Sequence, residues 1–279
     1  MAGVPPRVER GDSQFGHANR RLAPPARWSQ PPPRSAAVVS ARVSLAMQAA
    51  NYPRTSDREA QRTRETLGRY RSREYVRRYR AEYTNGLMPK HLRSRVVAAG
   101  EKAVIAQLLR EIDPAGSALL DVPCGAGKLG PLLQTFPVHV VAADGSREML
   151  ALAGDEYHPA QLLRVLQCDA RALPFKDGSV DVVICLRLFH LLPPATRRMI
   201  LGEFRRITRG QLLVSYSYGS GLQRIRRAVR TLYARESRRV FHVPLSDMMK
   251  EIEAAGFRPR QWKYVLPVLS SEIVVCAAA

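Results

Sequence analysis

The sequence has few cysteines and no long apolar run. Its four cysteines stand singly, without a CxxC pair, which excludes a disulfide scaffold and a zinc ribbon and is typical of a reducing compartment. No apolar run approaches the roughly 20 residues needed to span a bilayer. With 279 residues, 46% of them hydrophobic, the chain is long enough to bury a sizeable core. We therefore expect a cytoplasmic globular protein.

Negative charge is scarce in two parts of the chain, whose net charge is +20. Residues 1–100 contain 20 Lys+Arg against 7 Asp+Glu (+13), residues 101–215 contain 13 against 12 (+1), and residues 216–279 contain 11 against 5 (+6). A nearly neutral middle segment thus lies between two basic flanks. Such flanks fit RNA, an anionic membrane surface or an acidic substrate, and equally a solvated tail that binds nothing.

Residues 1–50 are predicted to form a disordered tail. The stretch 1–46 holds seven prolines and seven arginines but two acidic residues, and no helical or strand period is sustained. Its composition partly resembles an organellar transit peptide, although the prolines disfavour the amphipathic helix that such a peptide needs. An organellar location is therefore the alternative, and Met47 is an alternative start.

Residues 51–99 are predicted to form a basic helical cap. Between Asp57 and Tyr83 the tyrosines 75, 79 and 83 recur every four residues among arginines, a spacing that places them on one face of a helix. Such a helix lays an aromatic stripe on the main domain, caps a site, or faces RNA. A second helix is expected over residues 91–112.

Residues 100–279 alternate short apolar strands with helices, which predicts βαβ units and a parallel sheet covered on both faces. Helices are expected at 147–152, 194–206 and 246–257, the last with Ser246 as N-cap and Gly256 as its end. The expected strands are 117–122, 138–144, 162–169, 180–186, 210–217, 260–266 and 271–278.

Carboxylates and glycines stand where these strands end. The first strand is followed by a turn that contains Gly125 and Gly127, and Asp121, Asp144 and Asp169 lie at three strand ends. Ligands of open α/β sheets bind at this edge, and an acidic residue at the second strand end accepts hydrogen bonds from ribose hydroxyls. None of the strand ends supplies a lysine to hold a phosphate. The pattern suits an adenosine that carries ammonium and sulfonium groups rather than an anionic pyrophosphate.

Three stretches, SALLDVPCGAGKLGPLL (117–133), VVAADGSREML (140–150) and LQCDARALPFKDGSVDVVICLRLFHLL (166–192), resemble the class I S-adenosylmethionine-dependent methyltransferases. The similarity is greatest to the group that includes the ubiquinone/menaquinone-type (type 11) enzymes, and it covers residues 100–216 well and the remainder loosely. It implies a Rossmann-like α/β fold with a seven-stranded mixed sheet, helices on both faces and an antiparallel last strand pair. It also implies S-adenosylmethionine as cofactor, S-adenosylhomocysteine as product, and no metal.

The resemblance assigns a part of the cofactor to each strand end. Asp121 and the glycine turn would lie beside the methionine part, Asp144 would hold the ribose hydroxyls, and Asp169 would meet the adenine. The family's first loop glycine is Pro123 here, which removes one N–H donor. The implied cofactor-binding residues are Asp121, Pro123, Gly125, Gly127, Asp144, Gly145, Met149, Asp169, Ala170, Leu186 and Arg187.

Two other functions fit parts of the same motif. Residues 125–130 match GxGxxG, and Asp144 follows Gly125 by 19 residues, which is the dinucleotide fingerprint of NAD(P)-binding proteins. Asp121 argues against it, because a carboxylate contributes nothing to a pyrophosphate site. A Rossmann-like domain without catalytic activity is the other alternative.

Methyl transfer from a sulfonium requires alignment more than a catalytic residue. His190 lies just beyond the fourth strand and is the candidate base, or else a hydrogen-bonded structural histidine. The basic segment 218–245 is expected to be a lid or acceptor insert, since the segment after the fifth strand has that role in this fold. We expect a small or lipid-associated acceptor, with an anionic membrane surface or RNA as the partner of the basic helices and an RNA acceptor as the alternative.

Overall fold

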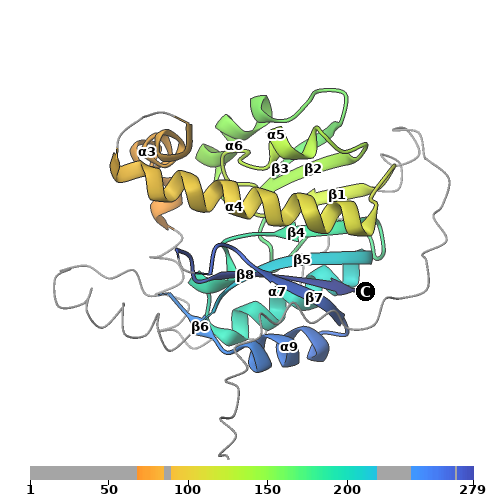
Figure 1. Cartoon of the computed structure of the whole chain (residues 1–279). Helices are drawn as coiled ribbons and strands as arrows, with labels where there is room; N and C mark the ends of the chain where they lie inside the picture. The colour runs from red at the N-terminus through yellow and green to blue at the C-terminus, as the bar shows by residue number, and fades with distance from the viewer. Residues whose placement is uncertain (1–67, 85–88, 219–239, 268) are drawn as a thin grey trace, which may run out of the picture.

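The computed structural model in Figure 1 describes residues 68–84, 89–218, 240–267 and 269–279. Its centre is one mixed sheet with the strand order β3-β2-β1-β4-β5-β8-β7. Strands β1 to β5 pair in parallel, whereas β8 is antiparallel to both β5 and β7. The strands are β1 (Ala118–Asp121), β2 (His139–Asp144), β3 (Leu162–Gln167), β4 (Val180–Cys185), β5 (Thr208–Tyr218), β6 (His242–Val243), β7 (Arg258–Tyr264) and β8 (Glu272–Ala278).

This architecture confirms the α/β class and the seven strands expected from the sequence. The eighth strand, β6, was not expected; it has two residues and pairs with the end of β5 outside the main path. Its position matters because it follows the basic segment 219–239, which lies outside the described residues. It therefore returns the chain to the carboxyl edge of the sheet.

Helices cover both faces of the sheet. Alternate residues of each strand point to opposite faces, so Leu119 packs in a core with α4, whereas Leu120 packs in a second core with α7 and α9. In Figure 1, α4 crosses the face toward the viewer. The helices are η1 (Arg69–Arg71), α3 (Arg73–Thr84), α4 (Pro89–Ile112), α5 (Gly130–Leu133), α6 (Arg147–Ala153), η2 (Gly154–Glu156), η3 (Phe189–Leu191), α7 (Pro194–Ile207) and α9 (Leu245–Ala254).

The two ends of α9 differ in how well the sequence predicts them. Gly256 has a φ of +88° and its N–H donates to Glu253, which ends the helix as expected. The predicted N-cap is wrong: Pro244 occupies that position, and the Ser246 hydroxyl donates to Asp247 instead. Proline fixes φ near the value found here, −60°, so the chain enters the helix without a side-chain cap.

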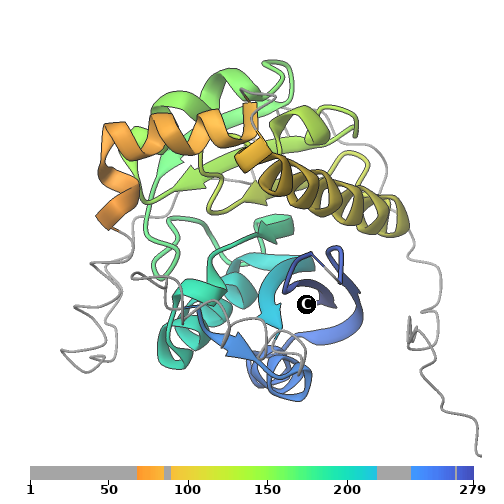
Figure 2. The same cartoon turned by 60° about the vertical axis from the view of Figure 1, so that its left-hand side comes forward.

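The N-terminal helices η1 and α3 lie against the main domain. Val76 packs with Ala126, in the loop after β1, and with Met149 of α6, and the partly buried Tyr70 and Tyr79 pack against the same cluster. Figure 2 shows η1 and α3, in orange, beside α6. Tyr75 and Tyr79 stack with centroids 6.3 Å apart. The aromatic residues therefore face the domain; residues 57–67 and the Tyr83 side chain lie outside the described part.

The outer face of α3 is basic, since Arg73, Arg77 and Arg78 are exposed. No helix in the described part of the chain is both long and apolar enough to cross a bilayer.

Candidate functional site

The carboxyl ends of the parallel strands meet at one edge of the sheet. From β1 the chain continues to β2 on one side, and β4 lies on the other, so the strand order reverses between β1 and β4. Open α/β sheets bind ligands in the crevice outside such a switch point. Asp121 and Asp144, which end β1 and β2, lie at this edge.

The loop after β1 approaches its neighbours closely and leaves space on one side. Gly125 and Gly127 have φ values of +55° and +77°, a region that favours glycine. A Cβ on Gly125 would meet none of the described atoms within 4 Å, whereas one on Gly127 would lie 2.7 Å from Glu156 Cβ. The loop is thus packed on one side and open beside Gly125.

Asp144 connects the first two strand ends. Its Oδ2 accepts a hydrogen bond from Gly125 N at 2.9 Å, and its Oδ1 accepts one from Ser146 N at 2.8 Å. Burial raises the pKa of this carboxyl, and the backbone N–H groups of Ser146, Gly125 and Gly145 oppose the shift. A carboxylate has about four acceptor positions, so Asp144 retains capacity for a ligand hydroxyl.

Asp121 is buried beside Tyr157, a residue that the sequence analysis did not single out. The Tyr157 hydroxyl donates to Asp121 Oδ2 at 2.6 Å. Burial raises the pKa of Asp121 to about 7, despite the Tyr157 hydrogen bond, and the negative charges of Asp144 and Glu101 raise it further. A buried carboxyl that titrates near neutral pH is typical of a functional site.

Asp169 lies just beyond β3 and is paired within its own loop. Arg171 donates to both carboxylate oxygens, the shortest contact being 2.6 Å from Nη2 to Oδ2. Burial alone would raise the pKa of Asp169, but the hydrogen bonds and charge of Arg171, together with the charge of Arg71, lower it overall. Asp169 is therefore an ionised acceptor held in a fixed position.

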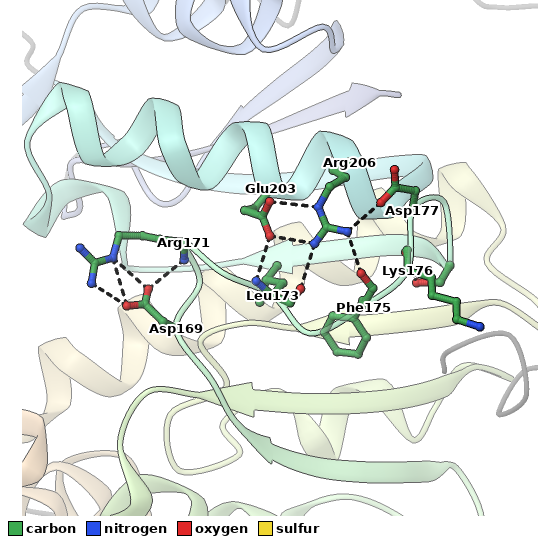
Figure 3. A network of polar contacts seen from close by, with 9 residues as sticks. Asp169, Arg171, Leu173, Phe175, Lys176, Asp177, Glu203 and Arg206 are labelled. Carbon is green, nitrogen blue, oxygen red and sulfur yellow. Dashed lines mark hydrogen bonds and ion pairs between the residues drawn. The ribbon is translucent and has the colours of Figure 1, made fainter. Parts of the chain in front are cut away.

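Arg206 of α7 holds the next part of this loop in place (Figure 3). Its guanidinium donates to the carbonyl oxygens of Leu173 at 2.9 Å and Phe175 at 2.7 Å. It also pairs with Glu203 and Asp177, and Glu203 accepts from Leu173 N at 2.9 Å. The planar donor set of arginine suits this arrangement. The network fixes the chain between Asp169 and β4.

Four charged residues meet at the ends of the loop, β4 and β8. We call Glu101 of α4, Lys128 of the loop, Arg187 after β4 and Glu272 of β8 the buried charge cluster. Lys128 Nζ forms an ion pair with Glu101 Oε2, and Arg187 Nη1 lies 3.7 Å from the same oxygen. Glu101 is completely buried. Lys128, which belongs to the loop after β1, is thus already ion-paired with the Glu101 carboxylate.

The backbone near this cluster is strained. Arg187 has a φ of +59°, unusual for a residue with a side chain, and its N–H donates to Ser215 Oγ at 2.8 Å. Such conformations persist only where surrounding contacts enforce them, and they concentrate at functional sites. The neighbouring Leu186 is buried.

His190, the candidate base, lies in η3 beyond the end of β4. Its backbone oxygen accepts from Phe241 N at 2.8 Å, so the segment that leads into β6 touches it. A second histidine, His242 of β6, forms a 2.9 Å contact between Nδ1 and Ser217 Oγ. His242 was not among the residues expected at the site, because the strand that positions it was not predicted from the sequence.

The structure brings most predicted site residues to the same edge. Met149 is completely buried under α3, Gly145 is exposed, and Pro123 and Ala170 are partly buried. The peptide bond before Pro123 is cis. Among the described residues, no group of three or more His, Cys, Asp or Glu side chains is arranged to hold a metal. All four cysteines are free thiols.

Among the residues near the site that were not predicted, Glu101 could have been recognised from the sequence pattern. It lies on the same helical face as Val97, Ile105 and Leu108, where an apolar residue is expected, and a charge there indicates a buried partner. Glu272 and Tyr157 could not, since only the tertiary structure brings them to the strand ends.

Comparisons with known proteins agree with this geometry. Residues 119–211 match the family model described as a methyltransferase domain. A tRNA (carboxymethyluridine(34)-5-O)-methyltransferase, ALKBH8 of Mus musculus, is 32% identical over 104 residues, which are 36% of this chain and 15% of the mouse protein. The Macaca fascicularis protein of the same name is 31% identical over 97 residues, or 34% of this chain and 14% of its own length. The chain thus matches only a small part of these relatives.

Solved structures match the fold more widely. The magnesium protoporphyrin IX methyltransferase of Synechocystis PCC 6803, crystallised with bound S-adenosylhomocysteine, has a TM-score of 0.66 and 18% identity, covering 77% of this chain and 99% of that one. Human N-acetylserotonin methyltransferase in complex with S-adenosylmethionine has a TM-score of 0.53 and 16% identity, covering 76% and 58%. Residues 119–211 therefore match the methyltransferase domain family, and the chain has the Rossmann-like fold seen in the class I S-adenosylmethionine-dependent methyltransferases.

Proposed function

We propose that this protein is a methyltransferase that uses S-adenosylmethionine. The observation that carries the proposal is the position of Asp144, whose two oxygens are fixed by the N–H groups of Gly125 and Ser146 beside the open space at Gly125. Asp144 ends the second strand, where a carboxylate binds the hydroxyls of a ribose. The match to the methyltransferase domain over residues 119–211 supports the same conclusion.

The residues at the site fit this cofactor. Asp144 would hold the ribose hydroxyls, Asp169 and Ala170 the adenine, and Asp121, with the glycine loop, the methionine end. Asp121 and Asp144 are buried carboxylates, which favour a cationic ligand and disfavour a pyrophosphate. S-adenosylmethionine supplies a methyl group on a sulfonium, whose departure leaves a neutral thioether.

The chain's own contribution is alignment and the exclusion of water. The loop, Asp144 and the Arg206 network fix the strand ends, and α3 covers Ala126 and Met149. Holding two reactants in line replaces a bimolecular encounter with a positioned one, which removes much of the barrier. His190 is our candidate for accepting a proton from the acceptor, because it lies beyond the end of β4.

For the acceptor we propose a small or lipid-associated molecule, with an RNA as the second candidate. The expected insert 218–245 and the cap offer basic surface to an anionic partner, whether a membrane or RNA. The similarity of 104 residues to a tRNA methyltransferase favours RNA, whereas the structurally similar Synechocystis enzyme is named for a porphyrin. We propose the cytoplasm as the compartment, since all four cysteines are free thiols.

The test is calorimetric titration of the full chain with S-adenosylhomocysteine, with NADH as the control ligand. Micromolar binding of S-adenosylhomocysteine alone is expected. Binding of NADH alone would support the dinucleotide-binding alternative, and binding of neither ligand would support a domain without catalytic activity. Either result would refute the proposed function.

A further inference from the structure

Tyr157 and Asp121 form a buried hydrogen-bonded pair at the end of β1. The Tyr157 side chain is 4% exposed and the Asp121 side chain 2%, and the Tyr157 hydroxyl donates to Asp121 Oδ2 at 2.6 Å. The backbone of Asp121 is fixed by its place in the sheet, where it pairs with Ala142 of β2 and Ile184 of β4. Among the described residues, Tyr157 alone donates a hydrogen bond to the Asp121 carboxylate. The orientation of that carboxylate therefore depends on Tyr157.

Tyr157 is itself held in a fixed position. It follows η2, and its N–H donates to the backbone oxygen of Gly154 at 3.4 Å. Its ring belongs to the same hydrophobic cluster as Cys124 and Leu129 of the loop after β1. A Cβ on Gly130 would lie 3.1 Å from Tyr157 N, so the chain leaving the loop packs directly against Tyr157. The loop and the tyrosine thus form one rigid unit beside the strand end.

The acceptor of the Tyr157 hydroxyl is a functional group rather than a neutral one. A buried tyrosine needs a hydrogen-bond partner, and a backbone oxygen would satisfy it. Here the partner is the carboxylate that ends β1, beside the switch point between β1 and β4. The tyrosine takes one of about four acceptor positions of a carboxylate, so Asp121 retains capacity for a ligand donor.

We propose that Tyr157 is a positioning residue whose hydroxyl holds the Asp121 carboxylate in place for the ammonium group of the bound cofactor. The inference rests on the proposed function, in which Asp121 and the glycine loop bind the methionine end. Tyr157 acts through Asp121, by fixing its orientation and by favouring its charged form.

The hydrogen bond keeps Asp121 available as an anion near neutral pH. Burial raises the pKa of Asp121 to about 7, and the hydrogen bond from Tyr157 opposes the shift. Without the hydroxyl the pKa of Asp121 would be higher still, and most of the carboxyl would be protonated at pH 7. A protonated carboxyl attracts an ammonium group much less, so loss of the hydroxyl weakens binding below and around neutral pH and matters little above it.

Other titratable groups face Asp121 from the neighbouring elements. They are Asp144 of β2, Glu101 of α4, Lys128 and Cys124 of the loop, and Cys185 of β4. Burial raises the pKa of both thiols well above the usual value, so they stay neutral. The other three groups act on Asp121 with or without the Tyr157 hydroxyl. Their titration, like that of the ligand's own amino group, cancels when two proteins are compared at one pH.

The experiment is calorimetric titration of the full chain with S-adenosylhomocysteine at about pH 6, 7 and 8, for the wild type and for Tyr157→Phe. A hydrogen bond to a charged group corresponds to about one pKa unit or more. For a shift of one unit, the dissociation constant of Tyr157→Phe divided by that of the wild type is expected to be roughly tenfold at pH 6, about fivefold at pH 7 and about twofold at pH 8. A purely structural role would give the same ratio at all three pH values, and that result would overturn the inference.

Tyr216→Phe is the matched control. Tyr216 is also buried and also donates to a carboxylate, that of Glu251, at 3.3 Å. It belongs to the core cluster on the face of the sheet that α7 and α9 cover, away from the glycine loop. The ratio for Tyr216→Phe is expected to stay near one at every pH. A fall with pH in both variants would contradict the assignment to Tyr157.

The wild-type series tests the inference without any variant, and it decides alone if Tyr157→Phe does not fold. Because the ammonium group needs the ionised carboxylate, the affinity for S-adenosylhomocysteine is expected to rise severalfold between about pH 5.5 and 7. An affinity that stays constant over this range would overturn the inference but leave the proposed function intact, since the ligand still binds. Failure of the wild type to bind the ligand at any pH would refute the proposed function as well.

Discussion

Gly130, the first residue of α5, should not accept a side chain without a shift of the backbone. A Cβ at this position would lie 2.1 Å from the backbone oxygen of Glu156 and 2.5 Å from its carbonyl carbon. Ordinary contacts to a Cβ begin at 3.4 Å, so Gly130→Ala must separate the two segments by about 1.3 Å (3.4 − 2.1). The obstacle is backbone, which cannot rotate away as a side chain can.

The expected cost is that of overpacking, about 1–3 kcal/mol. For a domain of this size, each kcal/mol shifts the melting temperature by about 2–4 °C, so Gly130→Ala should melt roughly 2–12 °C below the wild type. Because the displaced segment continues into Tyr157, the hydrogen bond from Tyr157 to Asp121 should also lengthen. The affinity for S-adenosylhomocysteine is therefore expected to fall with the stability.

Gly202 provides the matched control. It lies in the interior of α7, it is exposed, and a Cβ there would meet nothing within 4 Å of the described atoms. Gly202→Ala should stabilise the protein by about 0.5–1 kcal/mol through helix propensity. Thermal unfolding followed by circular dichroism compares the three proteins. An unchanged melting temperature in Gly130→Ala would refute the close approach of the loop to residues 156–157.

Three further predictions concern the strand ends. Asp144→Ala should weaken the binding of S-adenosylhomocysteine severely in calorimetry, and normal binding would mean that β2 does not hold the ribose. Asp121→Asn should raise the melting temperature of the ligand-free protein at about pH 8 and change it much less near pH 4, because a carboxyl whose pKa rises from 3.8 to about 7 on folding costs stability progressively as the pH rises through that range; equal shifts at both pH values would contradict this. Arg206→Lys should cost about 1–3 kcal/mol in urea unfolding, since lysine cannot donate to Leu173, Phe175 and Glu203 together, and a cost near zero would show that the network is not needed.

The sequence predicts the sheet well because its strands are short apolar runs between turn residues. Strands buried on both faces require such runs, and each of the seven expected strands begins and ends within two residues of the observed one. Strand β6 could not be predicted in this way: the two residues His242 and Val243 have no measurable period, and only pairing with β5 makes them a strand. The predicted N-cap of α9, Ser246, was wrong because Pro244 occupies the N-cap position and Ser246 lies within the helix.

The site residues that could be predicted from the sequence are those at the end of a strand. Asp121, Asp144 and Asp169 each close or follow an apolar run, so the pattern itself places them at one edge. Tyr157 and Glu272 belong to a loop and to the start of an antiparallel strand, and they reach the same edge through tertiary contacts between residues 36 apart and more. Local pattern carries no information about such contacts.

The buried carboxylates have an energetic consequence for the ligand-free protein. Asp121 and Glu272 both have pKa values raised to about 7 by burial, so keeping them ionised above that pH lowers the free energy of unfolding. A chain selected for stability alone would replace them with neutral residues, because uncompensated buried charge is among the larger destabilising features. A cation bound at the loop offsets the same charge. The free energy that the ionised carboxyl costs the ligand-free protein then contributes to the affinity for that cation. The position of Asp121 at the switch point between β1 and β4, rather than elsewhere in the core, is therefore best explained by a cationic ligand.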